Sequence, residues 1–407
     1  MHGARPTSVR LPPLDSWRRL HVDPTLPAAA ARVDPGAVAD VDRLRQQWPA
    51  DDVAAALSLA DARRRLATKF ADANSLWADR EAAEQATSAT VASWKAERFR
   101  RAGAQGIEDR CSGMGGDTMS LALVAPTIGV DASDVRAWMT SINAKCETVV
   151  GDATDPALRA EYVHFDPARR DEAAGRRQFE LSAHSPPVDV CFAISRAARG
   201  AAVKLGPGLP LPMPAALGAE RDGELEFLSE GGRLVQTVCW FGTLASSPGE
   251  RSATMLPERL SLSGRPNPVS SDVPLAGAFG RYLYVANPAL ERAELLGVLA
   301  RRFNLAERAP GLGVLTSDEE IRDPWLTGYE IVARPRPREA DVARELAALG
   351  ASGARVRTRG RSADADAWTK ALRNRASGST GVATELDVFL LRAGTTLEAI
   401  VARPIRD

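Results

Sequence analysis

The 407-residue sequence has few cysteines and no long apolar run, and each absence excludes a class of protein. Its four cysteines lie far apart and form no C-x-x-C pair, which excludes a disulfide framework and a cysteine-based zinc site and indicates reduced thiols. No stretch approaches the roughly 18 apolar residues of a membrane span, and residues 1–17 lack the apolar segment of a secretory signal. We therefore expect a cytoplasmic protein that has no membrane partner.

The chain also lacks a net charge, because 52 lysines and arginines balance 52 aspartates and glutamates. A neutral chain carries no global field that would attract nucleic acid, so any basic surface must be local. The hydrophobic share of 44% and the charged share of 26% are ordinary for a globular protein. At this length two or three domains are expected, each with its own core.

Composition and hydrophobic periodicity divide the chain into five predicted regions. The N-terminus is rich in proline, alanine and arginine, and a 3.6-residue apolar period follows it. Strand and helix patterns then alternate, which predicts an α/β fold with a doubly wound, mostly parallel sheet. The regions are an extended or flexible segment (1–40), helices (41–104), the α/β core (105–214), a β-rich extension packed on that core (215–333), and a smaller α+β domain (334–407).

The most informative motif is a glycine-rich turn between two predicted strands. Glycines let the backbone bend sharply and approach a ligand closely. The dinucleotide pattern G-x-G-x-x-G fails, because Thr118 stands where the third glycine belongs. An acid, three residues and then G-x-G is instead the turn of enzymes that bind S-adenosylmethionine; the alternative is a glycine turn without a ligand. The predicted cofactor residues of this turn are Asp109, Cys111, Gly113, Gly115, Gly116 and Asp117.

Two further acids follow predicted strands of the same core. Asp131 closes the apolar strand 127–131, and its carboxylate can accept hydrogen bonds from both ribose hydroxyls. Asp152 ends the next strand, where it can accept from the adenine amine while the backbone N–H of Ala153 reaches the ring. For Asp152 the alternative is an N-cap of the following turn. Ligands of such sheets bind at the carboxyl ends of the strands, where all these acids fall.

The segment Asp166-Pro167-Ala168-Arg169 closes the fourth predicted strand. A rigid Asp-Pro turn can hold a carboxylate or a carbonyl against an acceptor amine, orient it and accept its proton. Asp166, Pro167 and Arg169 are therefore the predicted acceptor side, and Arg169 could meet a phosphate or carboxylate. The alternative is a plain turn at the end of a strand. Lys204 ends the fifth predicted strand and is expected to line the same crevice, and no metal site is predicted.

The tail is locally basic although the whole chain is neutral. Residues 334–375 carry eleven lysines or arginines against five acids. Arg355, Arg357 and Arg359 alternate on a predicted strand, so their side chains share one face. Such a row suits a phosphate backbone; the alternative is a solvated face of a sheet.

On these residues the chain resembles the bacterial class I S-adenosylmethionine-dependent methyltransferases that carry a C-terminal THUMP-like domain, over roughly residues 48–405. The resemblance implies a Rossmann-like core, S-adenosylmethionine as cofactor and, because THUMP domains bind RNA, an RNA nitrogen as methyl acceptor. Enzymes that methylate exocyclic amines usually have a second proline and then an aromatic or small residue where Ala168 and Arg169 stand here. A non-catalytic RNA-binding protein and a methyltransferase of small molecules or proteins remain alternatives. The motifs that carry the resemblance are Lys69-Phe70, Glu84-Gln85-Ala86-Thr87, the turn 109–117, Asp166-Pro167-Ala168-Arg169-Arg170, Val203-Lys204-Leu205-Gly206-Pro207-Gly208, Cys239-Trp240-Phe241-Gly242 and the basic tail.

Overall fold

A computed structural model describes residues 11–34, 36–169, 184–266, 273–351, 353–360, 363–376 and 385–405. Residues 1–10 and Arg170, which belong to predicted regions above, lie outside the described residues. The chain divides into two compact units. The first comprises Met1–Glu230, Val235–Glu250 and Leu256–Leu260, and the second comprises Gly231–Leu234, Arg251–Met255 and Ser261–Asp407.

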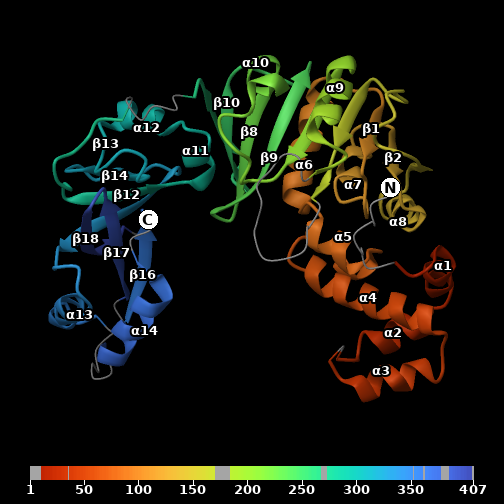
Figure 1. Cartoon of the computed structure of the whole chain (residues 1–407), viewed down its shortest axis with the longest axis horizontal. Helices are drawn as coiled ribbons and strands as arrows, with labels where there is room; N and C mark the ends of the chain where they lie inside the picture. Colours follow the sequence, from red (N-terminus) through yellow and green to blue (C-terminus); the bar gives the residue numbers. More distant parts are fainter. Residues whose placement is uncertain are drawn as a thin grey trace, which may run out of the picture. The chain divides into compact units, whose positions relative to one another are not determined.

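The predicted doubly wound, mostly parallel sheet is confirmed. Five neighbouring strands are parallel, in the order β3-β2-β1-β4-β7, and β9 continues the sheet antiparallel to β7. The whole sheet runs β11-β10-β8-β9-β7-β4-β1-β2-β3 (Figure 1). The strands are β1 (Ile107–Arg110), β2 (Thr127–Asp131), β3 (Glu147–Val150), β4 (Tyr162–Phe165), β7 (Gly200–Leu205), β8 (Glu224–Glu230), β9 (Arg233–Gly242), β10 (Arg251–Leu256) and β11 (Leu260–Gly264).

The order of the parallel strands reverses between β1 and β4. Successive strands run outward from β1 to β3 on one side, and the chain then crosses to β4 on the other. Such a switch point opens a crevice at the carboxyl ends of the strands, because the connecting segments leave in opposite directions there. The register places Asp109 of β1 opposite His164 of β4 and Gly129 of β2. The switch point therefore lies beside the predicted glycine turn.

Helices cover both faces of this sheet. Trp240 and Phe241 are successive residues of β9, so their side chains point to opposite faces. Trp240 packs with Phe99 of α6 (Ala89–Arg101) and with α7 (Thr118–Leu121). Phe241 lies 5.0 Å from the ring of Phe192 in α9 (Val188–Ala197). α7 is only four residues long, and Ser88 caps α6 by accepting from the N–H of Val91.

The expectation of an extended N-terminus is wrong for the described residues 11–34, which form two helices. Trp17 and Leu20 of the first helix and Leu26 of the second are buried against α4, Trp77 and α8. Pro13 and Pro24 stand at the N-caps of these helices and do not interrupt them, which is a position that proline tolerates. The helices of this region and its neighbour are α1 (Leu14–Val22), α2 (Thr25–Ala30), α3 (Val38–Arg45), α4 (Ala50–Leu66), α5 (Arg80–Gln85) and α8 (Asp134–Ala144) (Figure 1).

The second unit is built on a seven-stranded sheet of order β13-β14-β12-β15-β18-β17-β16. β15 ends at Ala333 and pairs antiparallel with β18, so the predicted boundary near residue 334 falls inside one continuous sheet. The strands are β12 (Tyr282–Ala286), β13 (Ala306–Glu307), β14 (Val314–Ser317), β15 (Leu326–Ala333), β16 (Gly353–Arg359), β17 (Glu385–Ala393) and β18 (Thr396–Pro404). The helices are α11 (Pro288–Arg292), α12 (Leu296–Phe303), α13 (Glu339–Ala348) and α14 (Ala365–Ala376).

The remaining elements are short. They are α10 (Ala219–Asp222), the two-stranded pair of β5 (Ala168–Arg169) and β6 (His184–Ser185), and the 3-10 turns Ala73–Ser75 and Ala215–Leu217. Among the described helices, none has both the length and the apolar character that a membrane crossing requires.

Candidate functional site

A pocket lies at the switch point, where the prediction places the cofactor. Its enclosed volume is about 60 Å³. Residues from the ends of β1, β2 and β4, from the glycine turn and from the segment 82–87 line it. Of the predicted site residues, the lining includes Asp109, Cys111, Gly113, Gly116, Asp117, Asp131 and Asp166, together with Ala168.

The glycine turn has the backbone that its sequence predicts. Gly113 and Gly115 have positive φ values of 60° and 85°, and Cys111 shares this region at 64°. A β-carbon on Gly115 would come within 3.2 Å of the Cα of Thr140, so a side chain there would also crowd α8. Burial raises the pKa of the Cys111 thiol well above its ordinary value, which disfavours the thiolate that a nucleophile needs.

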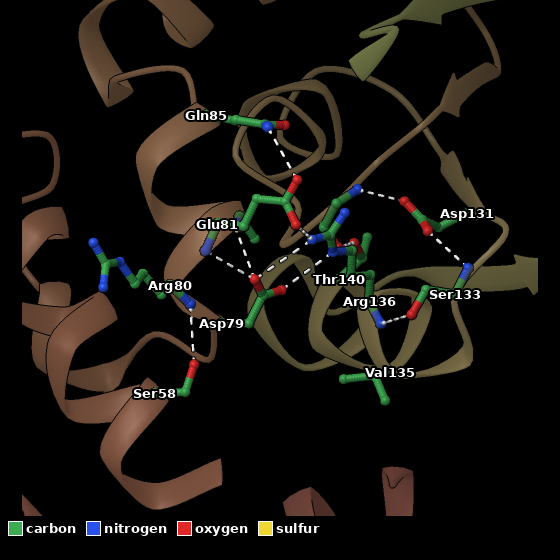
Figure 2. Close-up of polar contacts among 12 residues, drawn as sticks. Ser58, Asp79, Arg80, Glu81, Gln85, Asp131, Ser133, Val135, Arg136 and Thr140 are labelled. Carbon is green, nitrogen blue, oxygen red and sulfur yellow. Dashed lines mark hydrogen bonds and ion pairs between the residues drawn. The ribbon is translucent and has the colours of Figure 1, made fainter. Parts of the chain in front are cut away.

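Asp131 ties this turn to the end of β2. One carboxylate oxygen accepts from the N–H of Gly113 and the other from the N–H of Ser133, both at 2.9 Å (Figure 2). Burial raises the pKa of Asp131, although these two N–H donors oppose the shift. A carboxylate has about four acceptor positions, and two are used here. Asp131 can therefore accept two further hydrogen bonds from a diol.

A buried chain of polar side chains lies beneath the pocket. Asp109, Lys95, Asp117 and His164 are each at most 6% exposed. His164 Nδ1 lies 2.7 Å from Asp109 and its Nε2 lies 3.1 Å from Lys95 Nζ, which in turn lies 2.7 Å from Asp117. An ammonium group only donates, so Nε2 accepts and the imidazole carries its proton on Nδ1, which donates to Asp109. Thr118 donates to the other oxygen of Asp109.

This arrangement lowers the pKa values of both Lys95 and Asp117. Burial lowers the pKa of Lys95, although the charge of Asp117 opposes the shift. Burial alone would raise the pKa of Asp117, but the ammonium of Lys95 outweighs it and holds the pKa well below its ordinary value. The hydroxyl of Thr87 donates to the same carboxylate at 2.8 Å. Asp117 is therefore ionised throughout the neutral range.

The wall opposite the strands is held by Lys69. Its ammonium donates to the carbonyls of Ala83, Glu84 and Ala86 at 2.7–2.9 Å, just where α5 ends and its carbonyls lack helical partners. Residues 82–87 include four of the pocket-lining residues. Lys69 of the motif 69–70 thus holds the second motif, 84–87, in place.

Arg136 of α8 joins the beginning of α5 to the same rim. Its guanidinium donates to Asp79 at 3.1 Å and to Glu81 at 2.8 Å (Figure 2). Burial lowers the pKa of Arg136, but Asp79 and Glu81 outweigh it and hold the pKa above the ordinary value. Asp79 also caps α5 by accepting from the N–H groups of Glu81 and Ala82. This network fixes α5 against the helix that follows Asp131.

Of the predicted acceptor side, Asp166 lines the pocket. Asp166 follows β4, and its Oδ2 accepts from Lys204 Nζ at 2.6 Å. Burial lowers the pKa of Lys204, but the charge of Asp166 outweighs it and raises the pKa. Oδ1 of Asp166 has no hydrogen-bond partner among the described residues, and the side chain is 28% exposed. One oxygen is thus anchored while the other remains available at the pocket.

Several predicted residues do not line the pocket. Asp152 is exposed and bonds the N–H and hydroxyl of Thr154 at 2.8 Å, which is the turn-capping role considered for it. Ala153 is buried, and its carbonyl accepts from Arg110. Gly115 packs closely against Thr140 of α8, and Pro167 precedes β5. The backbone of Arg169 is part of β5, which pairs with β6.

Sequence reasoning missed the lysine network and the ion pairs of α5. Lys95 gave one signal, because it lies among Val91, Ala92, Ala96 and Phe99 on the buried face of α6. A lysine at such a position needs a buried partner, since an unpaired charge is costly there. Its partners lie on other elements, which periodicity does not identify.

The pocket lining is strongly acidic. Four aspartates line it, namely Asp109, Asp117, Asp131 and Asp166, and Arg136 is the one cation in the described lining. The ammonium groups of Lys95 and Lys204 lie behind two of these carboxylates. Such a pocket favours a ligand that carries positive charge and hydrogen-bond donors.

The fold of the chain is similar to that of a solved protein structure. No protein-family model and no curated protein matches the sequence. A proposed methyltransferase from Porphyromonas gingivalis W83 aligns at 17% identity over 97% of this chain and 98% of its own, with a TM-score of 0.71. A TehB-like SAM-dependent methyltransferase from Corynebacterium glutamicum aligns at 15% identity over 36% of this chain and 86% of its own, with a TM-score of only 0.25, too low to indicate a shared fold. The first likeness shows that nearly the whole chain has the fold of the Porphyromonas gingivalis protein.

Proposed function

We propose that the protein is an S-adenosylmethionine-dependent methyltransferase. The observation that carries this proposal is the acidic pocket at the switch point, built around a turn with left-handed glycines. A sulfonium nucleoside with an amino group and a ribose diol matches the charge and the acceptors of that pocket. The Porphyromonas gingivalis protein of the same fold is itself described as a methyltransferase, which supports the proposal.

The pocket residues offer the hydrogen-bond acceptors and the negative charge that such a cofactor requires. Asp131 has two unused acceptor positions for the ribose hydroxyls, and the turn from Gly113 to Gly116 offers backbone that approaches a ligand closely. Asp109 and Asp117 place negative charge at the floor, where an amino group or sulfonium is favoured. The enclosed 60 Å³ is smaller than the ~300–1,000 Å³ of pockets that engulf a whole ligand. The remainder of the cofactor must therefore occupy the open side of the pocket.

When bound, the cofactor supplies a methyl group on a positively charged sulfur, which a nucleophilic nitrogen can attack directly. The protein then has to align the acceptor, exclude water and manage one proton. Asp166 suits the last task, because Lys204 anchors Oδ2 and leaves Oδ1 to accept an N–H of the acceptor amine. The turn Asp166-Pro167 restricts the backbone at this position, and Arg169 follows it on β5.

We assign the acceptor to RNA, with a nitrogen atom as the methylated position. The assignment is supported by the basic tail, and in particular by Arg336 and Arg338, which are both exposed at the junction of β15 and α13. The arginine row of β16 supports it less. Arg357 bonds Asp387 at 2.6 Å and Arg359 bonds Glu291 at 3.2 Å, so both already have carboxylate partners.

Methyl transfer tests the function directly. We expect the protein to move labelled methyl groups from S-adenosylmethionine into total cellular RNA, and a deletion strain to lack one methylated nucleoside by mass spectrometry. Asp166→Asn should reduce the rate at least about 100-fold, because the amide is a poor proton acceptor. Asp189→Asn, at an exposed position of α9, is the matched control and should leave the rate unchanged. Full activity of Asp166→Asn would contradict the role given to this carboxylate.

RNA binding is tested separately by its salt dependence. The double variant Arg336→Ala/Arg338→Ala should bind RNA more weakly, and the slope of log K against log salt should become shallower by about one to one and a half, given roughly 0.7 per phosphate contact on single strands. Fluorescence anisotropy at several salt concentrations measures both quantities. Arg344→Ala is the control, because Arg344 is exposed but paired with Asp341. An unchanged slope in the double variant removes these arginines from the interface.

The ion pairs of Arg357 and Arg359 favour a second candidate, a methyltransferase that acts on a small molecule or a protein. In that case the cofactor site keeps its role, and the second unit makes no contact with RNA. The two candidates differ in one result, because only the first predicts salt-dependent RNA binding together with label in RNA.

A further inference from the structure

The second unit contains a cavity that the proposed methyl transfer does not use. It has a volume of about 500 Å³, within the ~300–1,000 Å³ typical of small-molecule sites. Its walls come from α11, α12, the loop before β14 and the end of β16. The apolar part of the lining includes Val273, Leu295, Leu296 and Val298. The cavity is therefore large enough for a ligand with an apolar or aromatic body.

Four arginines and three glutamates supply the charge of this lining. The arginines are Arg265, Arg292, Arg301 and Arg359, and the glutamates are Glu291, Glu294 and Glu307. Arginine is the side chain best suited to phosphate, because its planar guanidinium donates two parallel hydrogen bonds.

Each of the three glutamates already has a partner within the second unit. Glu307 is 1% exposed and accepts from the N–H groups of Gly311 and Gly313. Glu291 pairs with Arg359 at 3.2 Å, and Glu294 pairs with Arg251 at 2.7 Å. The negative charge of the lining is thus committed to holding the walls, and Arg359 is committed with it.

Two of the four arginines lie in the last turns of the two helices, Arg292 in α11 and Arg301 in α12. Burial lowers the pKa of Arg292; Glu294 opposes this shift and the neighbouring charge of Arg251 adds to it. Arg301 and Arg265 are exposed at the mouth of the cavity, so a ligand can reach them from solvent.

The backbone of residues 311–313 forms a wall of the cavity that packs closely against the carboxylate of Glu291. Gly311 and Gly313 both have positive φ values, and a β-carbon on Gly313 would come within 2.6 Å of a carboxylate oxygen of Glu291. Because Glu307 holds the N–H groups of the same two glycines, this loop is fixed from within the unit. The cavity wall is therefore built from bonded elements.

We propose that this cavity binds an organic phosphate of mononucleotide size, with the phosphate on the arginines at its mouth and the ring against its apolar wall. The proposal is independent of the methyltransferase assignment, because no residue of the switch-point pocket takes part. A free nucleotide and the 5′-phosphorylated end of an RNA share this chemistry.

Calorimetric titration of the full-length protein with adenosine and uridine 5′-monophosphates tests the proposal. We expect saturable binding to at least one of them, at least about tenfold tighter than to the matching nucleoside, because the nucleoside has no phosphate for the arginines. Arg301→Ala should weaken the binding at least about tenfold. Arg302→Ala, the next residue of α12, is the matched control, because Arg302 is exposed but does not line the cavity.

The titrations have outcomes that support the proposed nucleotide site and outcomes that contradict it. Absence of binding to both nucleotides, equal binding of nucleotide and nucleoside, or equal effects of the two arginine variants would overturn the proposal. Competition by S-adenosylhomocysteine would place the nucleotide in the first unit and would also overturn it. If a 5′-phosphorylated tetranucleotide binds more tightly than the mononucleotide, the ligand is an RNA end; if it binds equally or more weakly, the ligand is a free nucleotide.

Discussion

Replacing Asp131 with asparagine should weaken the binding of S-adenosylhomocysteine about 100-fold or more. The carboxylate accepts one hydrogen bond from the N–H of Gly113 and one from the N–H of Ser133, and its two remaining acceptor positions are those assigned to the ribose. Hydrogen bonds to a charged partner contribute ~1.5–3 kcal/mol each, so losing the charge and half of the acceptors removes a large share of the binding free energy. Isothermal titration measures the effect.

The asparagine also turns an NH₂ group toward one of the two backbone donors, which loosens the glycine turn. Asp134→Asn controls for a general effect of charge removal, because Asp134 lies three residues later, is exposed and accepts only from the N–H of Val135 at the start of α8. It should bind the cofactor as the wild type does. Equal affinities of the Asp131 variant and the wild type would show that the ribose is not held here.

Replacing Lys95 with methionine should destabilise the fold by ~3–5 kcal/mol at neutral pH. The ammonium is the main positive charge facing Asp117, and both side chains are almost completely buried. Removing one partner of a buried ion pair leaves the other charge uncompensated, which is far more costly than removing both. Urea unfolding measures the change. The double variant Lys95→Met/Asp117→Leu should recover much of the loss.

The pH dependence of this loss has a definite sign. In the wild type the pKa of Asp117 lies below its ordinary value, so its stabilising contribution is present above about pH 4 and is lost as the pH falls further. In the variant, burial without the ammonium raises that pKa, so acid should stabilise the variant relative to the wild type. The difference between the two unfolding free energies should therefore shrink from pH 7 toward pH 4. A constant difference would contradict the pairing.

The sequence predicts the strands and helices of the core well, because local signals mark them. The predicted strand 127–131 agrees with β2, an apolar strand that ends at Asp131 just before Ser133 caps α8. The segment 1–40 shows the limit of that approach. Its prolines read as breaks, yet two of them begin helices whose apolar residues find partners on α4 and α8.

The sequence predicts those residues of the site that lie at the ends of strands. Asp109, Asp131 and Asp166 reach the pocket because parallel strands bring their carboxyl ends to one edge, and Asp117 reaches it from the end of the glycine turn. What the sequence could not supply is the long-range pairing behind them. Lys69 meets the end of α5, and Lys204 meets Asp166 from a strand 38 residues later. Such pairs depend on how elements pack, which periodicity does not encode.

A crystal structure of the protein grown with S-adenosylhomocysteine tests the central claim most directly. We predict electron density along the glycine turn, with both ribose hydroxyls on the carboxylate at the end of β2 and the amino group over the acidic floor. Density confined to the arginine-lined cavity of the second unit, or none in the presence of saturating ligand, would contradict the account.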